Sequence, residues 1–191
     1  MARILGTISS SFTEATSFES IATVTVGSGG VDTITFSSIP STYTHLQIRV
    51  LVRTRNGGSP DNLYGRINSD TSTNYSNHYI IGNGTSASAG GGGNSDNFIA
   101  GRPTGGDSTV PANVFGVSVI DILDYANTNK YKTIRVLAGE DVNGSFEGNI
   151  GNVYFGSASW RSTSAITSLT FYPSFGWAQY SHIALYGIKG A

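Results

Sequence analysis

The chain has 191 residues, with 11 lysine and arginine residues against 12 aspartate and glutamate residues, and its formal net charge is -1. Because these charges are scattered, they create no field that would attract nucleic acid or an anionic membrane, so neither is an expected partner. No apolar run approaches the roughly 18 residues of a membrane span, so we expect a soluble protein. Aromatic residues make up 11% of the chain, which together with the low net charge excludes disorder.

Residues 1–17 are rich in serine and threonine and show neither helical nor strand periodicity. Their apolar stretch is too short for a signal peptide, so no secretion signal is expected. The rest of the chain has the length of one domain around a single core, and the absence of cysteine excludes a disulfide framework. We therefore predict an extended N-terminal arm over 1–17 and one β-sandwich domain over 18–191. The arm either frays or orders against a neighbouring subunit through its isolated apolar residues, Ile4, Leu5, Ile8 and Phe12.

From residue 20 onward, β-branched and aromatic residues recur with a period of two between glycine, asparagine, serine and proline. In the run 45–55, Leu46, Ile48 and Val50 predict one buried face, and Leu51 is the apolar exception on the solvated face. The run 115–123 is apolar on both faces over part of its length, which is typical of a central strand. Ten strands are predicted, at Ile21–Val26, Asp32–Phe36, His45–Arg55, Leu63–Asn68, His78–Ile81, Val114–Leu123, Tyr131–Ala138, Ile150–Trp160, Ile166–Tyr172 and Ser181–Tyr186.

Glycine and asparagine mark the connections between these runs. The segments 27–30 and 143–144 favour positive φ and predict hairpin turns. The segments 84–93 and 102–112 are predicted to be long surface loops, because glycine-rich backbone is costly to order. Many short antiparallel strands without a repeat of about 40 residues predict an all-β fold, an antiparallel β-sandwich of jelly-roll type. Oligomerisation or docking would cover the open sheet edges of such a fold.

The sequence assembles no recognisable catalytic, cofactor or metal site, so we predict a protein that is not an enzyme. His45, His78 and His182 are far apart and lack a zinc-binding spacing. No serine lies in the Gly-x-Ser-x-Gly pattern of a nucleophile elbow, and the glycine-rich run lacks the lysine of a phosphate loop. We accordingly expect no cofactor and no metal ion.

Paired carboxylates leave one enzymatic alternative open. Asp121 and Asp124 end one predicted strand and Glu140 and Asp141 end another, so these side chains could converge at one end of the sandwich, with Glu147 nearby, as in a glycosidase. The competing interpretation is solvated charges that end strands and cap turns. The spacing over 141–147 does not fit a calcium loop.

Aromatic residues at loop and strand-end positions give a binding alternative. Flat rings with a polar group can stack on sugars, and Tyr79, Trp160, Trp177 and Tyr180 are the candidate contacts for a glycan or a protein partner. The competing interpretation is that these rings belong to the core or to a subunit interface.

Four segments carry a resemblance to a known family. The closing segment 181–190, SHIALYGIKG, resembles that of small virion structural proteins of tailed phages, especially phages of cyanobacteria and marine bacteria. The segments 17–24 (SFESIATV), 36–46 (FSSIPSTYTHL) and 124–133 (DYANTNKYKT) are similar to phrases that recur in the same family. The resemblance spans most of the chain beyond the arm.

The resemblance implies a non-enzymatic β-sandwich, a homotrimer displayed on the virion, with no catalytic residues to transfer. Within it, our leading expectation is a capsid decoration or cement protein on the capsid surface, which binds the major capsid protein or other virion proteins through its arm. The first alternative is a short tail-fibre or tail-tip protein that binds host-surface glycan through its long loops. The second is the carboxylate-based glycosidase.

Overall fold

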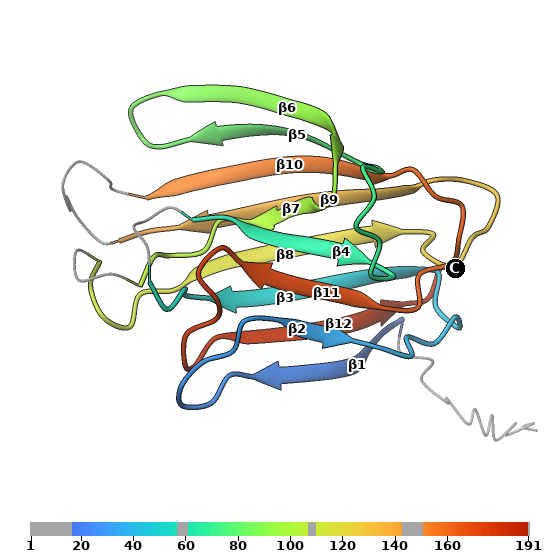
Figure 1. Ribbon diagram of the computed structural model, residues 1–191, viewed down its shortest axis with the longest axis horizontal. Helices are drawn as coiled ribbons and strands as arrows, with labels where there is room; N and C mark the ends of the chain where they lie inside the picture. The colour runs from blue at the N-terminus through green and yellow to red at the C-terminus, as the bar shows by residue number, and fades with distance from the viewer. Residues whose placement is uncertain (1–16, 57–60, 107–109, 143–150, 191) are drawn as a thin grey trace, which may run out of the picture.

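The computed structural model describes residues 17–56, 61–106, 110–142 and 151–190, which form 12 β-strands and no helix, and hence no helix that could cross a membrane. The strands build two antiparallel sheets that pack face to face (Figure 1), with the orders β1-β12-β3-β8-β9-β10-β5-β6 and β2-β11-β4-β7. The strands are β1 (Phe18–Thr25), β2 (Ile34–Phe36), β3 (His45–Val52), β4 (Leu63–Ile67), β5 (Tyr75–Gly82), β6 (Ala87–Ser95), β7 (Phe98–Gly101), β8 (Gly116–Leu123), β9 (Lys132–Glu140), β10 (Asn152–Trp160), β11 (Leu169–Pro173) and β12 (His182–Ile188).

Four nested strand pairs organise the sandwich. β1 pairs with β12 and β3 with β8 in the large sheet, and β2 pairs with β11 and β4 with β7 in the small sheet. Two further antiparallel pairs, β9–β10 and β5–β6, extend the large sheet beyond β8. The large sheet is therefore wider than the small one by these four strands. The more specific jelly-roll type stays a prediction.

The core lies between the two sheets and follows from the alternation along each strand. On the large sheet, Ile120 and Ile134 are 0% exposed, and Phe171 from the small sheet is equally buried. Each fully buried apolar side chain of this size contributes about 1.5–3 kcal/mol relative to an exposed position. The Phe98 ring meets Phe171 edge to face and lies over Gly65, where an added Cβ would come within 2.2 Å of the ring.

The prediction of an all-β sandwich is confirmed, and each of the ten predicted strands overlaps an observed one. The segment 98–101, which is β7, was not predicted because it is too short to show a period. The prediction of a loop over 84–93 is wrong, because Ala87–Ser95 forms the edge strand β6. Its residues pair with β5, so backbone hydrogen bonds order a segment that has few side chains to pack.

The prediction of a hairpin at residues 27–30 is also wrong. The positive φ is present, 88° at Gly29 and 69° at Gly30. However, the turn joins β1 to β2, and these strands belong to different sheets. Positive φ identifies a sharp turn but does not determine where the next strand pairs. The second predicted hairpin, at 143–144, lies outside the described residues.

Candidate interaction surface

The large sheet has one face against the small sheet and one face turned away from it, which we call the outer face. The outer face is apolar over four adjacent strands, β8, β9, β10 and β5, and the flanking strand β3 places Arg49 beside Val119. Five of its side chains are between 50% and 58% exposed: Ile80, Val117, Leu137, Val153 and Phe155. Scattered exposed apolar residues are ordinary on protein surfaces, but a contiguous patch of them marks an interaction site.

Strand register sets the exposed side chains in rows that cross the sheet. Val119, Leu137, Phe155 and Ile80 follow one another on β8, β9, β10 and β5, and we call them the central row. Ala89 on β6 continues this row as the register partner of Ile80. Cross-strand neighbours lie about 4.5–5.5 Å apart at Cβ, so the row is a continuous apolar ridge.

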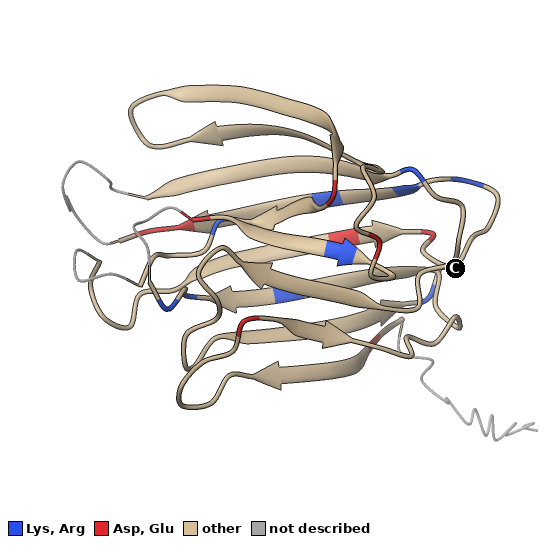
Figure 2. Ribbon diagram, viewed as in Figure 1, with Lys and Arg blue, Asp and Glu red and all other residues tan. Residues whose placement is uncertain are grey.

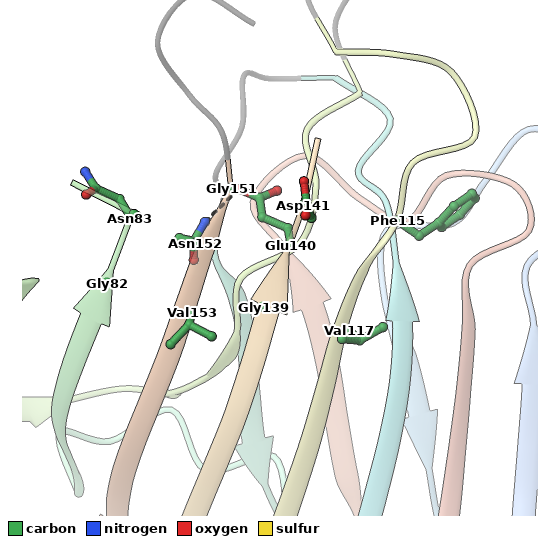
Figure 3. Close-up of a pocket in the computed structure, with 11 residues that line it drawn as sticks. Gly82, Asn83, Phe115, Val117, Gly139, Glu140, Asp141, Gly151, Asn152 and Val153 are labelled. Carbon is green, nitrogen blue, oxygen red and sulfur yellow. Dashed lines mark hydrogen bonds between the residues drawn. The ribbon is translucent and has the colours of Figure 1, made fainter. Parts of the chain in front are cut away.

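A second row, the glycine row, alternates large and absent side chains. Val117, Gly139, Val153 and Gly82 are successive register partners on β8, β9, β10 and β5. Figure 3 shows Val117 and Val153 on either side of Gly139. A hollow of about 610 Å³ opens along this row and extends to Phe115. The glycine row therefore offers both protruding side chains and space to receive them.

A third row, the polar row, borders the central row on its other side. It consists of Asp121, Arg135, Ser157 and His78, again on β8, β9, β10 and β5. The Arg135 guanidinium donates to the Asp121 carboxylate at 2.8 Å, and the Gln47 amide donates to the other carboxylate oxygen at 2.9 Å. The two charges neutralise each other, so this border presents hydrogen-bonding groups with little net charge.

Two smaller hollows indent the outer face near Phe155. One, of about 350 Å³, lies between His78, Ile80, Ala89 and Phe155, and the other, of about 270 Å³, lies between Val119, Leu137 and the polar row. Charged residues are sparse over the strands of both sheets (Figure 2). The relief of the outer face therefore comes mainly from apolar side chains of different size.

The N-terminal end of β1 lies in a hydrogen-bonded corner of the sandwich, which we call the arm corner. The Ser17 carbonyl accepts a hydrogen bond from the Lys189 amide at 3.0 Å. The Glu19 carboxylate accepts from the Tyr43 hydroxyl at 3.0 Å and from the Lys189 ammonium at 2.6 Å. The hydrogen bond to Glu19 is the main cause that raises the pKa of Tyr43. These contacts fix the first described residues of the chain to the closing segment.

The four segments that carry the family resemblance meet around the same corner. The Thr44 hydroxyl accepts from the Gly190 amide at 2.8 Å, which joins the second segment to the closing one. His45 Nδ1 accepts from the Asp124 amide at 3.0 Å, and the Tyr125 hydroxyl donates to the Pro40 carbonyl. These contacts give Thr44, His45 and Tyr125 a structural role in holding together segments that are distant in sequence.

The predicted aromatic contacts do not form one surface. Trp177 is 0% exposed and its indole donates to the Phe171 carbonyl at 3.2 Å, while Trp160 is 3% exposed, so both rings are core groups. Tyr180 is 63% exposed in the turn before β12. Tyr79 is half-buried on β5, against Tyr154, near the opposite edge of the sheet. Sequence position at a strand end did not reveal which rings face inward.

The Trp160 indole is part of a network around Asp70, in the connection between β4 and β5. Asp70 accepts from the indole at 2.7 Å, from the Asn74 amide at 3.0 Å and from the Ser72 backbone at 2.8 Å. Burial alone would raise the pKa of Asp70, but the hydrogen bonds together outweigh it and lower the pKa to about 2. The network fixes this connection to the end of β10.

The convergence of carboxylates that the glycosidase alternative requires is not found among the described residues. β8 and β9 are antiparallel neighbours, so Asp124, after the end of β8, and Glu140, at the end of β9, lie at opposite ends of the sheet. Asp124 pairs with Lys130, and Glu140 accepts from the Asn152 amide at 2.7 Å (Figure 3). Glu147 lies outside the described residues. The described carboxylates therefore do not form the facing pair that glycoside hydrolysis requires.

Metal-binding side chains are also dispersed. Among the residues that the structure describes, no three histidine, cysteine or acidic side chains could hold a metal ion together. His45 lies on β3, His78 on β5 and His182 on β12.

Lys132 is a buried lysine that its sequence pattern had not identified as a core residue. Lys132, at the start of β9, is 0% exposed, and its ammonium donates to the carbonyls of Lys130 at 3.0 Å and Thr163 at 3.2 Å. Burial, together with the charge of Lys130, lowers the pKa of Lys132. The alternation of Lys132 with the inward residues Ile134 and Val136 could have placed it on the core face. Its contacts with carbonyls tie the loops beside β9 together.

The arm residues Ile4, Leu5, Ile8 and Phe12 lie outside the described residues, so their contacts stay a prediction. No family model matches this chain, and no curated protein matches its sequence. A function is therefore inferred from the surfaces of the sandwich and from the resemblance of its segments.

Proposed function

We propose that this protein is a non-enzymatic structural protein of a tailed-phage virion, and that it works as a capsid decoration or cement protein. The observation that carries this proposal is the apolar outer face, because such a face supports assembly rather than chemistry. In this role the protein binds the major capsid shell as an oligomer and stabilises it.

The arm corner supports the second part of the proposal. Ser17 is held by Lys189, so the arm starts from a fixed point on a rigid sheet. An arm that starts there can place Ile4, Leu5, Ile8 and Phe12 in apolar grooves between capsid subunits. Ordering such an arm costs about 1–2 kcal/mol per residue, which burial of its apolar side chains must offset.

The composition of the exposed surface is compatible with display on a particle. Only 12% of the residues are charged, and hydroxyl, amide and glycine residues take their place. Such a surface attracts few charged macromolecules. The resemblance of four segments to phage virion proteins supports a phage virion as the particle.

The test is to locate the protein in a purified virion with an epitope inserted at Ser28. This residue is exposed in the turn between β1 and β2, at the end of β1 remote from the arm corner. A regular array of label over the head is the expected result. Label on the tail alone would favour the tail-fibre alternative, and virions without label would overturn the proposal.

A second variant tests the arm directly. Deletion of residues 1–16 should abolish binding to capsids that lack the protein, while the cooperative unfolding of the sandwich stays unchanged. Equal occupancy of full-length and shortened protein on such capsids would refute the role of the arm.

A further inference from the structure

We propose that the outer face binds a second copy of this chain in a two-fold symmetric dimer, with the symmetry axis parallel to the strands and between β9 and β10. This inference deepens the proposed function, because it names the partner of the surface on which that function rests, and it replaces the expected homotrimer with a dimer. It can nevertheless be tested on the isolated protein, away from any particle.

The position of the axis follows from the rows. A two-fold axis along the strands places each row over the same row of the second copy, so apolar side chains meet apolar side chains. An axis across the strands, centred on the central row, would instead place the glycine row over the polar row. Burial of Asp121 against Val117 and of Arg135 against Gly139 would cost desolvation without compensation.

Within the central row, this axis pairs β9 with β10 and β8 with β5 of the second copy. Leu137 then faces Phe155 of the second copy, and Val119 faces Ile80 of the second copy. Each of these contacts occurs twice by symmetry. Leu137, Phe155 and Ile80 are at least half exposed in the single chain, so they have apolar surface left to bury.

The glycine row is self-complementary under the same operation. Val153 faces the hollow above Gly139 of the second copy, and Val117 faces Gly82 of the second copy. No Cβ stands at either glycine, so the two sheets can approach closely at these positions. The hollow of about 610 Å³ along this row thus receives side chains that the same row supplies.

The polar rows of the two copies are also compatible with each other. Asp121 faces His78 of the second copy, and Arg135 faces Ser157 of the second copy. The Arg135–Asp121 ion pair at 2.8 Å within each chain leaves no like charge directly opposite another. Two copies therefore meet without repulsion along this border.

The size of the surface also fits a second copy. The six strands from β3 to β6 span about 24 Å. Four rows span about 20 Å, counting the row of Leu123, Thr133, Ser159 and Ser76 beyond the polar row. The flat footprint is thus on the order of 500 Å² per copy, or about 1,000 Å² for the pair, which reaches the minimum for a specific interface.

Association of the isolated protein is the first measurement. Sedimentation velocity over a concentration series should show a dimer, and Leu137→Asp should raise its dissociation constant more than about tenfold. Phe175→Asp is the matched control, because Phe175 is 49% exposed but lies between β11 and β12, away from the outer face. This control should associate like the wild type, and in dilute solution both variants should keep the melting temperature of the wild type.

Cross-linking then tests the axis, since the chain has no cysteine of its own. Val119→Cys and Ile80→Cys proteins are mixed with a bismaleimide whose arm is about 10 Å, the usual spacing of packed sheets. The mixture should give a covalent heterodimer. Val119→Cys alone should not react with itself, because its two copies lie roughly 17 Å apart, given three strand spacings and one sheet spacing.

A protein that stays monomeric, or a dimer that Leu137→Asp leaves intact, would overturn the inference. So would loss of association on deletion of residues 1–16 alone, which would assign the contact to the arm. A trimer, or cross-linking of Val119→Cys with itself, would refute the two-fold arrangement. Failure of capsid binding with the dimer intact would refute only the proposed function.

Discussion

Both faces of β9 and β10 carry large apolar side chains, but these side chains have opposite environments. Ile134 and Val136 point inward and are almost completely buried, while Leu137 and Phe155 point outward and are half exposed or more. The small sheet covers the first face and no other part of the described chain covers the second. Hydrophobicity therefore serves folding on one face, and on the other it is left for a partner.

Substitutions on the inner and the outer face of one strand, two or three residues apart, should therefore affect stability differently. Inner substitutions should lower the free energy of unfolding at any protein concentration. Outer substitutions should act only where a partner is present. The following experiments test this difference, from the largest expected effect on stability to the smallest.

Ile134→Ala should give the largest effect. The side chain is 0% exposed in the core, so its truncation should cost about 2–5 kcal/mol in the free energy of unfolding. Urea denaturation at low concentration, where the chain is monomeric, measures this cost. A loss below about 1 kcal/mol would show that the two sheets do not pack as described.

Gly65→Ala should give the second largest loss of stability. The new methyl group would lie 2.2 Å from the Phe98 ring, so the ring or the strand must shift, at about 1–3 kcal/mol. Gly27→Ala is the control, because nothing lies within 4 Å of its added Cβ and the residue lies away from the outer face. Thermal unfolding of both variants gives the comparison, and equal melting temperatures would contradict the close packing of Phe98.

Trp160→Phe should weaken the Asp70 network by about 1 kcal/mol at neutral pH, after allowance for solvent screening. The pKa of Asp70 is about 2 in the folded protein, below its ordinary value, so its contribution is present above about pH 4 and is lost as the pH falls toward 2. The difference between wild type and variant should therefore shrink below pH 4.

Urea unfolding at pH 7 and pH 2.5 checks this dependence. The control compares Asp70→Asn with the double variant that carries both Asp70→Asn and Trp160→Phe. Neither protein has the carboxylate, so the difference between them measures the lost packing of the indole. A difference between Trp160→Phe and wild type that is the same at both pH values would assign the effect to packing alone.

Leu137→Ala should have the smallest effect on the monomer, within about 0.5 kcal/mol, because the side chain is 56% exposed. The melting temperature of dilute protein should stay the same, while its increase with protein concentration should be smaller than for the wild type. A large loss of stability in dilute protein would contradict the contrast between the faces.

The sequence predicted the strands well, because period-two alternation reports one buried face directly. It also contained a trace of the outer face. Leu51 is the apolar exception on its strand, and the run 115–123 is apolar on both sides. These features indicate two covered faces, and only the structure shows that the chain itself covers one. A pattern of burial cannot distinguish an internal layer from another molecule.

The remaining errors have physical causes. Residues 87–95 lack the side chains on which strand prediction depends, and their order comes from pairing with β5. The carboxylates of β8 and β9 stayed candidates for one site because the direction of a strand is not visible in its sequence. The indoles of Trp160 and Trp177 were candidates for a surface because tertiary burial is a non-local property.

The nesting of the strands also bears on synthesis. β12 lies between β1 and β3, so β1 has no partner in its sheet until Ile188 has left the ribosome. β2 likewise waits for β11. Contacts of such high sequence separation make folding slow, and a nascent chain exposes both unpaired strands and the apolar outer face throughout translation. We therefore expect the sandwich to complete its folding only after β12 has left the ribosome, and to depend on chaperones that shield nascent strands.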